Sequence, residues 1–333
     1  MILLTGATGF LGRSLAPALI AAGHQVRALV RPDSDAAFLD ELGIESALGD
    51  LTERESVLRA MQGCRMAVHA GGLFRLWGEA RRFERSNVEG TAYMLEAALR
   101  AGIDRFIYIS TVAVIGRPEP GKIIDEAHPL RPMDGYQRSK FDAENVVRMY
   151  FLTTGIPTIV LRPGAYYGPW GRYGWNRLFF EDPLRGLRLE VHGGKRITFP
   201  AFTPDVAAAV IAALSRGSPG QTYNVSGESI SHREANRIIS RQAGISGFRF
   251  PVPGALLLAL AQGLDWRAQR NGREPFYPLS LENYVFHDWR VSSEKARQEL
   301  GFAPTPFEDG ACQTLEWYES QGILKTRRTA WPR

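Results

Sequence analysis

A glycine-rich segment, residues 5–12 (TGATGFLG), stands between the first apolar run and the first helical pattern of the chain. Gly6 permits a tight turn, Gly9 lets the backbone approach a pyrophosphate group, and Gly12 allows close packing of helix and strand. The pyrophosphate would sit on the N–H groups at the helix N-terminus. A strand–helix junction is the context that such a site needs. We therefore predict a dinucleotide cofactor site that includes Gly6, Thr8, Gly9, Phe10, Leu11 and Gly12.

Apolar runs and helical patterns alternate along the first half of the chain. The runs that predict strands fall at residues 2–5, 25–30, 44–48, 66–69, 105–109 and 158–161. The patterns typical of helices fall at residues 11–22, 53–61, 83–101 and 136–154. Strands that alternate with helices favour a parallel sheet. We therefore predict an α/β fold, a doubly wound parallel sheet of the Rossmann type over residues 1–163, which binds its ligands at the carboxyl edge of the strands.

The second half is less regular and is expected to form a smaller C-terminal substrate-binding lobe. We assign residues 164–333 mainly to this lobe, with segments around residues 200–226 returning to the Rossmann domain. Helices are predicted at residues 204–214, 232–242, 253–270, 292–300 and 307–320, and a strand at 222–225. The apolar run at residues 253–261 is shorter than the roughly 20 residues that span a bilayer, so no transmembrane segment is expected. This apolar run fits a helix that is buried in the lobe. The alternatives are a helix that lines a substrate channel and a helix that contacts a membrane surface.

Charge and cysteine content exclude several classes of protein. The 333 residues carry a formal net charge of +5, interspersed along the chain, whereas a nucleic-acid-binding protein gathers its positive charge in a stripe or tail. One basic cluster lies at the end, at Lys325, Arg327, Arg328 and Arg333. Two cysteines form no disulfide framework, and neither they nor the six histidines have metal-ligand spacing. We expect a cytoplasmic protein with a small-molecule substrate, no nucleic-acid partner and no metal.

The residue that follows the second predicted strand indicates which dinucleotide binds. An acidic side chain there would bind the ribose 2′-hydroxyl of NAD, whereas a cation would pair with the 2′-phosphate of NADP. This chain has Arg31 at that place, so NADP(H) is the preferred cofactor. NAD(H) stays possible, because Asp33 is close enough to bind the ribose 2′-hydroxyl. Arg31 could also be an exposed loop residue that binds no ligand. Asp50 and Leu51, after the third strand, are placed to contact the adenine, although Asp50 also fits a helix cap.

Tyr136 and Lys140 are four residues apart on a predicted helix and therefore share one face. A free phenol has a pKa of about 10, and a neighbouring ammonium would lower that pKa. Such a tyrosine can exchange a proton with a substrate oxygen. Thr111, after the fifth strand, supplies a hydroxyl that can hold the same oxygen. The Tyr-x-x-x-Lys pattern is common by itself, and a pair on the protein surface would show it too.

Together these motifs resemble the extended short-chain dehydrogenase/reductase family, which includes NAD(P)-dependent epimerases and dehydratases. The resemblance extends over nearly the whole chain, through segments such as 5–12, 87–91, 162–169 and 205–207. It implies that Thr111 takes the place of a catalytic serine, that Tyr136 is the general acid or base, and that Lys140 binds the nicotinamide ribose. It also implies a homodimer through the helices at about 83–101 and 136–154. Further cofactor contacts are expected from His69, Ala70, Gly71, Pro163 and Gly164.

Three positions separate the branches of this family. Val112 and Ala113 follow Thr111 where sugar-nucleotide 4,6-dehydratases have Asp and Glu, so the extra acid and base are absent. Ala165 stands where sugar-nucleotide epimerases commonly have Asn. The chain therefore resembles the dihydroflavonol 4-reductase and 3β-hydroxysteroid dehydrogenase branch, whose members act on large apolar ketones or alcohols. Candidate residues of the substrate pocket are Phe74, Trp77, Val112, Tyr166, Trp170 and Trp175.

The sequence favours an NADP(H)-dependent oxidoreductase that transfers hydride to or from a carbonyl or alcohol carbon of a fairly large apolar substrate. An NAD-dependent sugar-nucleotide or related sugar epimerase is an alternative, because several lobe arginines would suit a diphosphate. These arginines are Arg172, Arg177, Arg185 and Arg188. A non-catalytic NADP-binding regulator is the alternative from another class, although such a protein has no need of Thr111, Tyr136 and Lys140 together.

Overall fold

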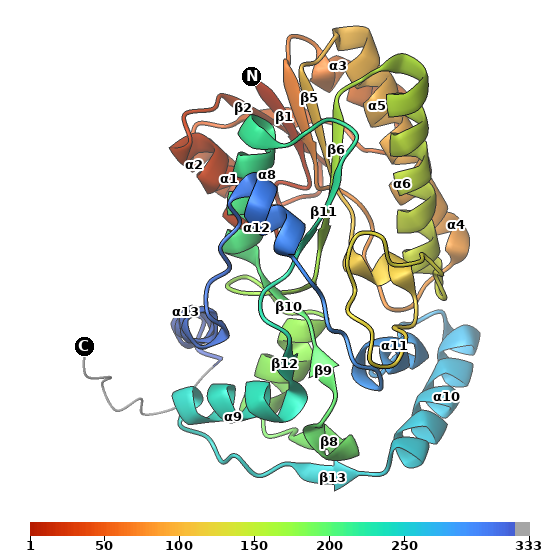
Figure 1. Ribbon diagram of the computed structural model, residues 1–333, viewed down its shortest axis with the longest axis vertical. Coiled ribbons are helices and arrows are strands. Elements are labelled where there is room, and N and C mark those ends of the chain that lie inside the picture. The colour runs from red at the N-terminus through yellow and green to blue at the C-terminus, as the bar shows by residue number, and fades with distance from the viewer. Residues whose placement is uncertain (324–333) are drawn as a thin grey trace.

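The computed structural model describes residues 1–323, so the basic cluster at the end of the chain lies outside the described residues. Its centre is a seven-stranded parallel sheet in the order β11-β6-β5-β4-β1-β2-β3 (Figure 1). The strands are β1 (Ile2–Thr5), β2 (Val26–Val30), β3 (Glu45–Leu48), β4 (Met66–His69), β5 (Arg105–Ile109), β6 (Thr158–Pro163) and β11 (Thr222–Val225). The strand order reverses beside β1, and ligands of doubly wound sheets bind at that switch point.

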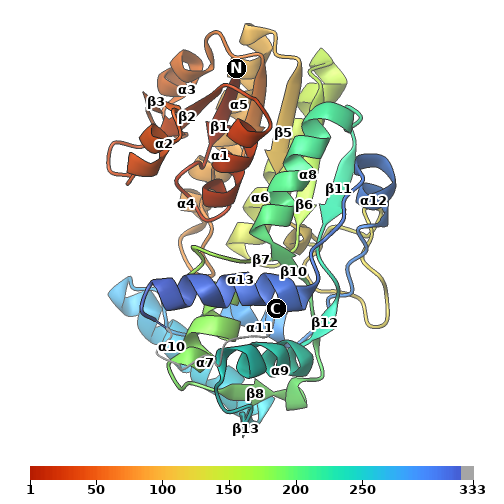
Figure 2. The ribbon, with the colours of Figure 1, turned by 90° about the vertical axis from the view of Figure 1, so that its left-hand side faces the viewer.

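Helices cover both faces of the sheet (Figure 2). On one face lie α1 (Gly12–Ala21), α8 (Thr203–Arg216) and α12 (Glu294–Leu300), with α2 (Ala37–Glu41) at the end of the same layer. On the other face lie α3 (Arg54–Met61), α5 (Gly90–Ala101) and α6 (Gly135–Thr154). The predicted doubly wound α/β fold is therefore confirmed.

Two apolar layers, one on each face of the sheet, form the core. Ile2 and Leu4 of β1 face the layer under α1 and α8, and Leu3 between them faces the layer under α3 and α5. Successive side chains of a strand point to opposite faces, and here both faces are covered. The strand is therefore apolar at every position, which is why a short apolar run was enough to predict it.

The helix predicted at residues 83–101 begins earlier and has an interruption. α4 (Ala80–Phe83) continues into a π-helical turn, η1 (Glu84–Glu89), before α5 begins at Gly90. Turns of this kind are frequent at functional sites. This one carries the buried Asn87. The hydrophobic pattern of the sequence does not show such a turn.

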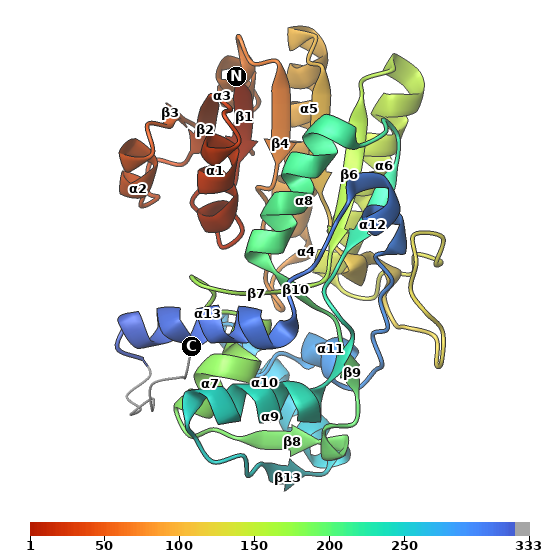
Figure 3. The same cartoon turned by 60° about the vertical axis from the view of Figure 1, so that its left-hand side comes forward.

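A smaller lobe lies beyond the carboxyl edge of the sheet (Figure 3). Its strands are paired, β7 (Ala165–Tyr167) with β10 (Pro200–Phe202), β9 (Ile197–Thr198) with β12 (Ile230–Ser231), and β8 (Leu189–Val191) with β13 (Phe250–Val252). The sequence did not predict these strands, because two or three residues are too few to show alternation. The helical segments are η3 (Arg177–Glu181), α7 (Asp182–Leu184), η4 (His192–Gly194), α9 (His232–Ala243), α10 (Gly254–Asn271), η5 (Leu279–Leu281), α11 (Glu282–Val285) and α13 (Phe307–Ser320).

Aromatic side chains form the centre of the lobe. The ring of Tyr167 lies 5.5 Å from that of Trp175 and 5.2 Å from those of Phe202 and Phe307, between ring centroids. These residues come from four separate segments, so the cluster joins the lobe together. Among residues 1–323, no helix has the length and apolar character needed to cross a membrane.

Candidate active site

The glycine-rich segment turns the chain sharply between β1 and α1. Gly6 has a φ angle of +74°, and a Cβ atom there would lie 2.7 Å from the carbonyl oxygen of Ala70. A Cβ atom on Gly12 would lie 2.1 Å from the carbonyl oxygen of Ala7. Both positions therefore exclude a side chain, and they bring the start of α1 close to the ends of β1 and β4.

The N-terminus of α1 has the features of an anion site. Within residues 1–323, the amides of Phe10, Leu11 and Gly12 have no protein acceptor. No side chain caps the helix, and its first turn has no acidic residue. A Cβ atom on Gly9 would meet only one backbone oxygen, at 3.2 Å, so the space before the helix is otherwise open. These free donors, with the half-buried Thr8 beside them, fit the pyrophosphate of a dinucleotide.

Arg31 lies at the end of β2, where its side chain is 62% exposed and its Nε is 3.7 Å from a carboxylate oxygen of Asp33. A cation and an anion are thus both available to the adenosine ribose. Asp50, after β3, accepts hydrogen bonds of 2.8 Å from both the amide and the hydroxyl of Thr52. These bonds form a local turn ahead of α3, whose N-cap residue is Glu53, so Asp50 does not have the helix-capping role that the sequence also allowed. Leu51 packs against the loop after β4.

His69 ends β4 and is buried between two threonines. Its Nδ1 is 2.7 Å from the hydroxyl oxygen of Thr5, and its Nε2 is 3.0 Å from that of Thr91. Burial, with a contribution from the Lys140 ammonium, lowers the pKa of His69 to about 3, so the ring is neutral at pH 7. The Thr5 hydroxyl also accepts a hydrogen bond of 2.9 Å from the amide of Gly71. The side chain of His69 therefore supports the cofactor loop from the core and, being 1% exposed, does not face a ligand.

Tyr136 lies in the first turn of α6, beside Thr111. The side chain of Asp134 caps this helix by accepting a hydrogen bond of 2.8 Å from the amide of Gln137. Burial, then the Asp134 carboxylate, raises the pKa of Tyr136, while a hydrogen bond with the Thr111 hydroxyl opposes the rise. Next to Thr111, the buried hydroxyl of Ser110 has no partner among the described residues. The structure thus brings Thr111 and Tyr136 together, with an unsatisfied polar atom beside them.

Lys140 follows one turn later on α6 and is buried. Its Nζ donates a hydrogen bond of 2.7 Å to the carbonyl oxygen of Ile109 and lies 4.3 Å from the centroid of the Tyr108 ring. Burial lowers the pKa of Lys140 to about 7, against the opposing effect of the Glu144 carboxylate. Lys140 is not among the groups that shift the pKa of Tyr136. The lowering expected from the sequence is absent here, because the ammonium is directed to the backbone of β5 and burial of the hydroxyl is the largest cause of the raised pKa of Tyr136.

Asn87 joins the loop after β4 to helix α6. Its Oδ1 accepts a hydrogen bond of 2.7 Å from the Leu73 amide, and its Nδ2 donates to the Leu73 carbonyl oxygen at 3.0 Å. The same Nδ2 donates to the hydroxyl of Ser139, at 2.8 Å. Asn87 therefore positions both the loop that carries Phe74 and the helix turn that carries Lys140. Asn87 belongs to the motif at residues 87–91, and this motif is the signal for it in the sequence.

Aromatic rings surround Tyr136. The Phe74 ring centroid is 4.7 Å from that of Tyr136 and 5.5 Å from that of Tyr173. The Tyr173 hydroxyl accepts a hydrogen bond of 2.8 Å from the backbone amide of Leu76, which fixes this wall. Burial and the proximity of Tyr136 raise the pKa of Tyr166. Phe74 and Tyr166 therefore lie beside the candidate acid, as a substrate pocket requires.

Trp175 lies in the core of the lobe. Its ring stacks on that of Phe179 at 4.0 Å, and its Nε1 donates a hydrogen bond of 2.8 Å to the Thr198 hydroxyl. It is 8% exposed, because residues of several segments enclose it. The structure thus gives Trp175 a packing role, whereas the sequence suggested a pocket wall. Pattern alone does not tell which side of an aromatic-rich segment faces a ligand.

The other predicted pocket residues are more dispersed. Val112 is fully buried directly after Thr111, in the short 3-10 helix η2 (Val112–Ile115). Trp170 is 47% exposed and lies 4.9 Å, at its ring centroid, from the guanidinium carbon of Arg13 on α1. Trp77 is half-buried in the loop after β4. The structure does not bring Trp170 and Trp77 into ring contact with Tyr136.

A family model matches residues 2–226, from β1 to the end of β11, and its description is the NAD dependent epimerase/dehydratase family. The chain belongs to this family. The resemblance seen in the sequence is therefore confirmed, and with it the binding of a nicotinamide cofactor. The open α1 N-terminus is where a member of the family would hold the cofactor pyrophosphate.

Several curated proteins are similar along nearly their whole length. Sterol demethylase protein B of Methylococcus capsulatus is 29% identical, over 97% of this chain and 99% of its own. The 4-hydroxy-2-methyl-3-oxo-4-farnesyl-3,4-dihydroquinoline-1-oxide ketoreductase of Stigmatella aurantiaca is 34% identical, over 90% and 91%. A putative dihydroflavonol 4-reductase of Synechocystis is 30% identical, over 97% and 96%. The chain therefore has the full domain content of these relatives.

A solved structure shares the whole architecture. The crystal structure of gox2253 matches with a TM-score of 0.84 and 31% identity, over 98% of this chain and 99% of that one. The agreement thus includes the lobe as well as the sheet.

Proposed function

We propose that the chain is an NADP(H)-dependent oxidoreductase that transfers hydride to or from a carbonyl or alcohol carbon of a fairly large apolar substrate. The observation that carries this proposal is the position of the half-buried Tyr136: the Thr111 hydroxyl lies close enough to oppose the rise of its pKa, and the Phe74 ring centroid is 4.7 Å from that of Tyr136. A proton donor among aromatic rings suits a carbonyl group on an apolar molecule.

Tyr136 acts as the general acid in reduction and as the general base in oxidation. The nicotinamide, when bound, supplies or accepts the hydride. In reduction the Tyr136 hydroxyl donates its proton to the substrate oxygen, and in oxidation it takes that proton back. The raised pKa of Tyr136 keeps the phenol protonated at neutral pH, which is the form that a general acid needs. Thr111 holds the same substrate oxygen, and Lys140 binds the nicotinamide ribose.

Two observations support an apolar carbonyl substrate over a sugar nucleotide. The name of the Stigmatella relative describes the reduction of a ketone on a farnesylated ring, and that of the Methylococcus relative describes sterol chemistry. Val112 and Ala113, next to Thr111, supply no acid or base for an elimination, and both are buried. The sugar epimerase is the second candidate, since the description of the matched family names NAD-dependent epimerases.

Arg31 supports the proposed preference for NADP(H). It is the exposed cation at the end of β2, and a guanidinium can bind a phosphate through two hydrogen bonds. Its partner Asp33 is held at 3.7 Å, a distance too long for a strong hydrogen bond. A 2′-phosphate can therefore replace Asp33 as the partner of the guanidinium at little cost in free energy.

Helices α5 and α6 support the proposed homodimer. Leu99, Met149 and Leu152 are 44%, 51% and 66% exposed on these helices. Large apolar side chains exposed on neighbouring helices are typical of an interface. The free thiol of the buried Cys64 agrees with the expected reducing, cytoplasmic compartment.

The direct test is NADPH oxidation with two groups of compounds, apolar cyclic ketones and nucleoside-diphosphate sugars. We expect turnover with the ketones only, and the Tyr136→Phe variant should have no measurable turnover while binding NADPH normally. Tyr150→Phe, on the same helix, is the matched control and should keep full activity. Activity in the Tyr136→Phe enzyme, or isomerisation of a sugar nucleotide without net NADPH oxidation, would refute the proposal.

A further inference from the structure

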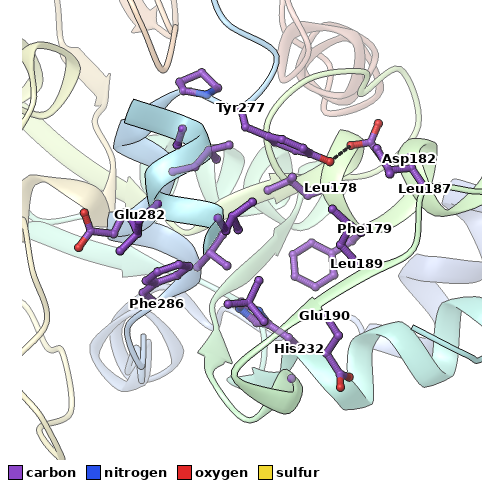
Figure 4. Close-up of a pocket in the computed structure, with 18 of the residues that line it drawn as sticks. Leu178, Phe179, Asp182, Leu187, Leu189, Glu190, His232, Tyr277, Glu282 and Phe286 are labelled. Carbon is purple, nitrogen blue, oxygen red and sulfur yellow. Dashed lines mark hydrogen bonds between the residues drawn. The ribbon is translucent and has the colours of Figure 1, made fainter. Parts of the chain in front are cut away.

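A pocket in the lobe lies outside the residues assigned above (Figure 4). Its volume is about 110 Å³, several times what one water molecule needs. Leu178 and Phe179 of η3, Leu189 of β8 and the inner residues Leu257 and Leu258 of α10 form most of its wall. An apolar wall of this kind gains little from water and favours an apolar ligand.

The charged groups of this wall are carboxylates, and arginines outside the wall neutralise each of them. Asp182 has the Arg177 guanidinium at 3.6 Å and accepts a hydrogen bond of 3.4 Å from the Tyr277 hydroxyl. Glu190 and Glu282 have arginine nitrogens at 4.0 Å and 3.7 Å. Within residues 1–323, no lysine or arginine lines the pocket. An anionic ligand such as a diphosphate therefore finds no free cation there.

Among the described residues, His232 is the one in the wall whose side chain has a buried polar atom without a partner. It begins α9, is 8% exposed, and meets the Phe179 ring edge-on at 5.2 Å. Its Nε2 is buried without a hydrogen-bond partner among the described residues. Burial lowers the pKa of His232 to about 4, so the ring is neutral at pH 7. An unsatisfied buried nitrogen costs free energy, which a ligand hydroxyl or carbonyl group would recover.

A chain of contacts joins this pocket to the catalytic tyrosine. Leu279 and Leu281 line the pocket, and Ser280 between them donates a hydrogen bond to the carbonyl oxygen of Leu76. Leu76 lies two residues after Phe74, whose ring contacts Tyr136. The segment at residues 279–281 therefore contacts both the pocket and the loop that carries Phe74.

We propose that this pocket binds the end of the substrate remote from the reacting carbon, an apolar, uncharged group with one hydroxyl or carbonyl that bonds to His232. This proposal rests on the proposed function and names its substrate class. The ligand is apolar because the wall is, uncharged because no free cation lines it, and polar at one point because Nε2 lacks a partner.

The test measures equilibrium binding and needs no turnover. Displacement of the neutral fluorophore N-phenyl-1-naphthylamine by 1-octanol and by octane is followed in the presence of NADPH. We expect the alcohol to bind at least tenfold more tightly than the alkane. His232→Phe keeps the aromatic contact with Phe179 but should make the two ligands equal.

Helix α10 supplies the matched pair of variants for the pocket itself. Leu258→Gln, on the inner face, should weaken fluorophore binding about tenfold or more, and Leu260→Gln, on the outer face, should leave it unchanged. If Leu258→Gln does not fold, Ala261→Leu fills the pocket without adding a polar group and should give the same loss. An unchanged affinity in the inner variants, or an alcohol preference that survives in His232→Phe, would overturn the proposal. Tyr136→Phe must still bind the fluorophore, which separates a failure of this site from a failure of the proposed chemistry.

The outer face of α10 carries a second, independent inference. Leu256, Leu260 and Trp266 are 63%, 52% and 58% exposed. The helical repeat places Arg267 and Arg270 on this same face, opposite the residues that line the pocket. The guanidinium carbon of Arg270 lies 3.5 Å from the centroid of the Trp266 ring. The helix lies at the edge of the lobe, away from the sheet (Figure 1).

We infer that this face binds the surface of a membrane that contains anionic lipids. Exposed leucines, a tryptophan and arginines on one face are typical of helices that lie in the interface of a bilayer. The arginines complement the negative charge of such a surface. An apolar substrate dissolved in the bilayer would then be close to the pocket on the opposite face of the same helix.

Flotation with lipid vesicles tests this inference. The protein should float with vesicles of phosphatidylcholine and phosphatidylserine, and much less with phosphatidylcholine alone. Leu256→Ser with Leu260→Ser should abolish flotation, and Arg267→Gln with Arg270→Gln should remove the dependence on phosphatidylserine. Ile123→Ser, 66% exposed in the segment before α6, is the control and should float normally. Absence of flotation, or a dimer that dissociates when the outer α10 leucines are replaced, would overturn the inference.

Discussion

The Lys140 ammonium donates a hydrogen bond of 2.7 Å to the carbonyl oxygen of Ile109, the last residue of β5. This bond ties α6 to the sheet, at the strand end where the Thr111 segment begins. Because the ammonium is buried, its pKa is about 7, against a usual value of 10.5. The charge of Lys140 is therefore only partly retained at neutral pH in this arrangement.

The lowered pKa of Lys140 predicts a dependence of stability on pH. Between about pH 7 and pH 10.5 the unfolded chain binds a proton that the folded chain has released, so the free energy of unfolding rises with pH across this window. Below pH 7 the buried charge costs stability in full. Lys140→Met should lack this rise. Urea unfolding of both proteins at pH 6.5, 8 and 9.5 measures it, and parallel curves for the two proteins would contradict the prediction.

The lowered pKa of His69 predicts a loss of stability at acid pH. Its folded pKa of about 3 lies below the usual 6.5, so the unfolded chain takes up a proton that the buried ring refuses. Stability should therefore fall as the pH drops from 6.5 toward 3. His69→Gln should lose part of this fall, while His24→Gln, far from the site on the loop before β2, should behave like the parent protein. Thermal unfolding between pH 7 and pH 4 provides the comparison.

If Arg31 binds the 2′-phosphate, it should make the protein prefer NADPH to NADH. Loss of charge-assisted hydrogen bonds to a 2′-phosphate costs about 1.5–3 kcal/mol, so Arg31→Ala should weaken NADPH binding by about 10- to 100-fold. NADH binding should change little, because NADH has no 2′-phosphate. Asp33→Asn removes the neighbouring carboxylate and should bind NADPH at least as well as the parent. Calorimetric titration of each protein with NADPH and with NADH measures these affinities. An equal loss of affinity for both cofactors would refute the 2′-phosphate role.

The sequence was sufficient wherever one local pattern determines the structure. Gly6 and Gly12 were predictable because a side chain at either position collides with backbone. The inner strands of the main sheet, such as β1, were predictable because both of their faces are covered, whereas the edge strand β3 is largely exposed. Trp175 was not, since its role depends on Phe179 and Thr198, which fold against it from other segments. The pKa of Lys140 was missed for the same reason, because a tyrosine–lysine spacing gives no information about burial.

Arg162 on β6 and Glu144 on α6 form a buried ion pair, and breaking it should destabilise the fold more than breaking an exposed pair. The guanidinium and carboxylate are 2.6 Å apart, with side-chain exposures of 7% and 8%. Removing one partner leaves the other charge buried and unpaired, so Glu144→Gln should lower the free energy of unfolding by about 3–5 kcal/mol. Arg237→Gln breaks an exposed pair with Glu234 and should change little, since exposed pairs are well screened. Urea unfolding at pH 7 checks both. A small effect of Glu144→Gln would mean that solvent or a new partner compensates Arg162, and α6 would then not depend on this pair for its place against the sheet.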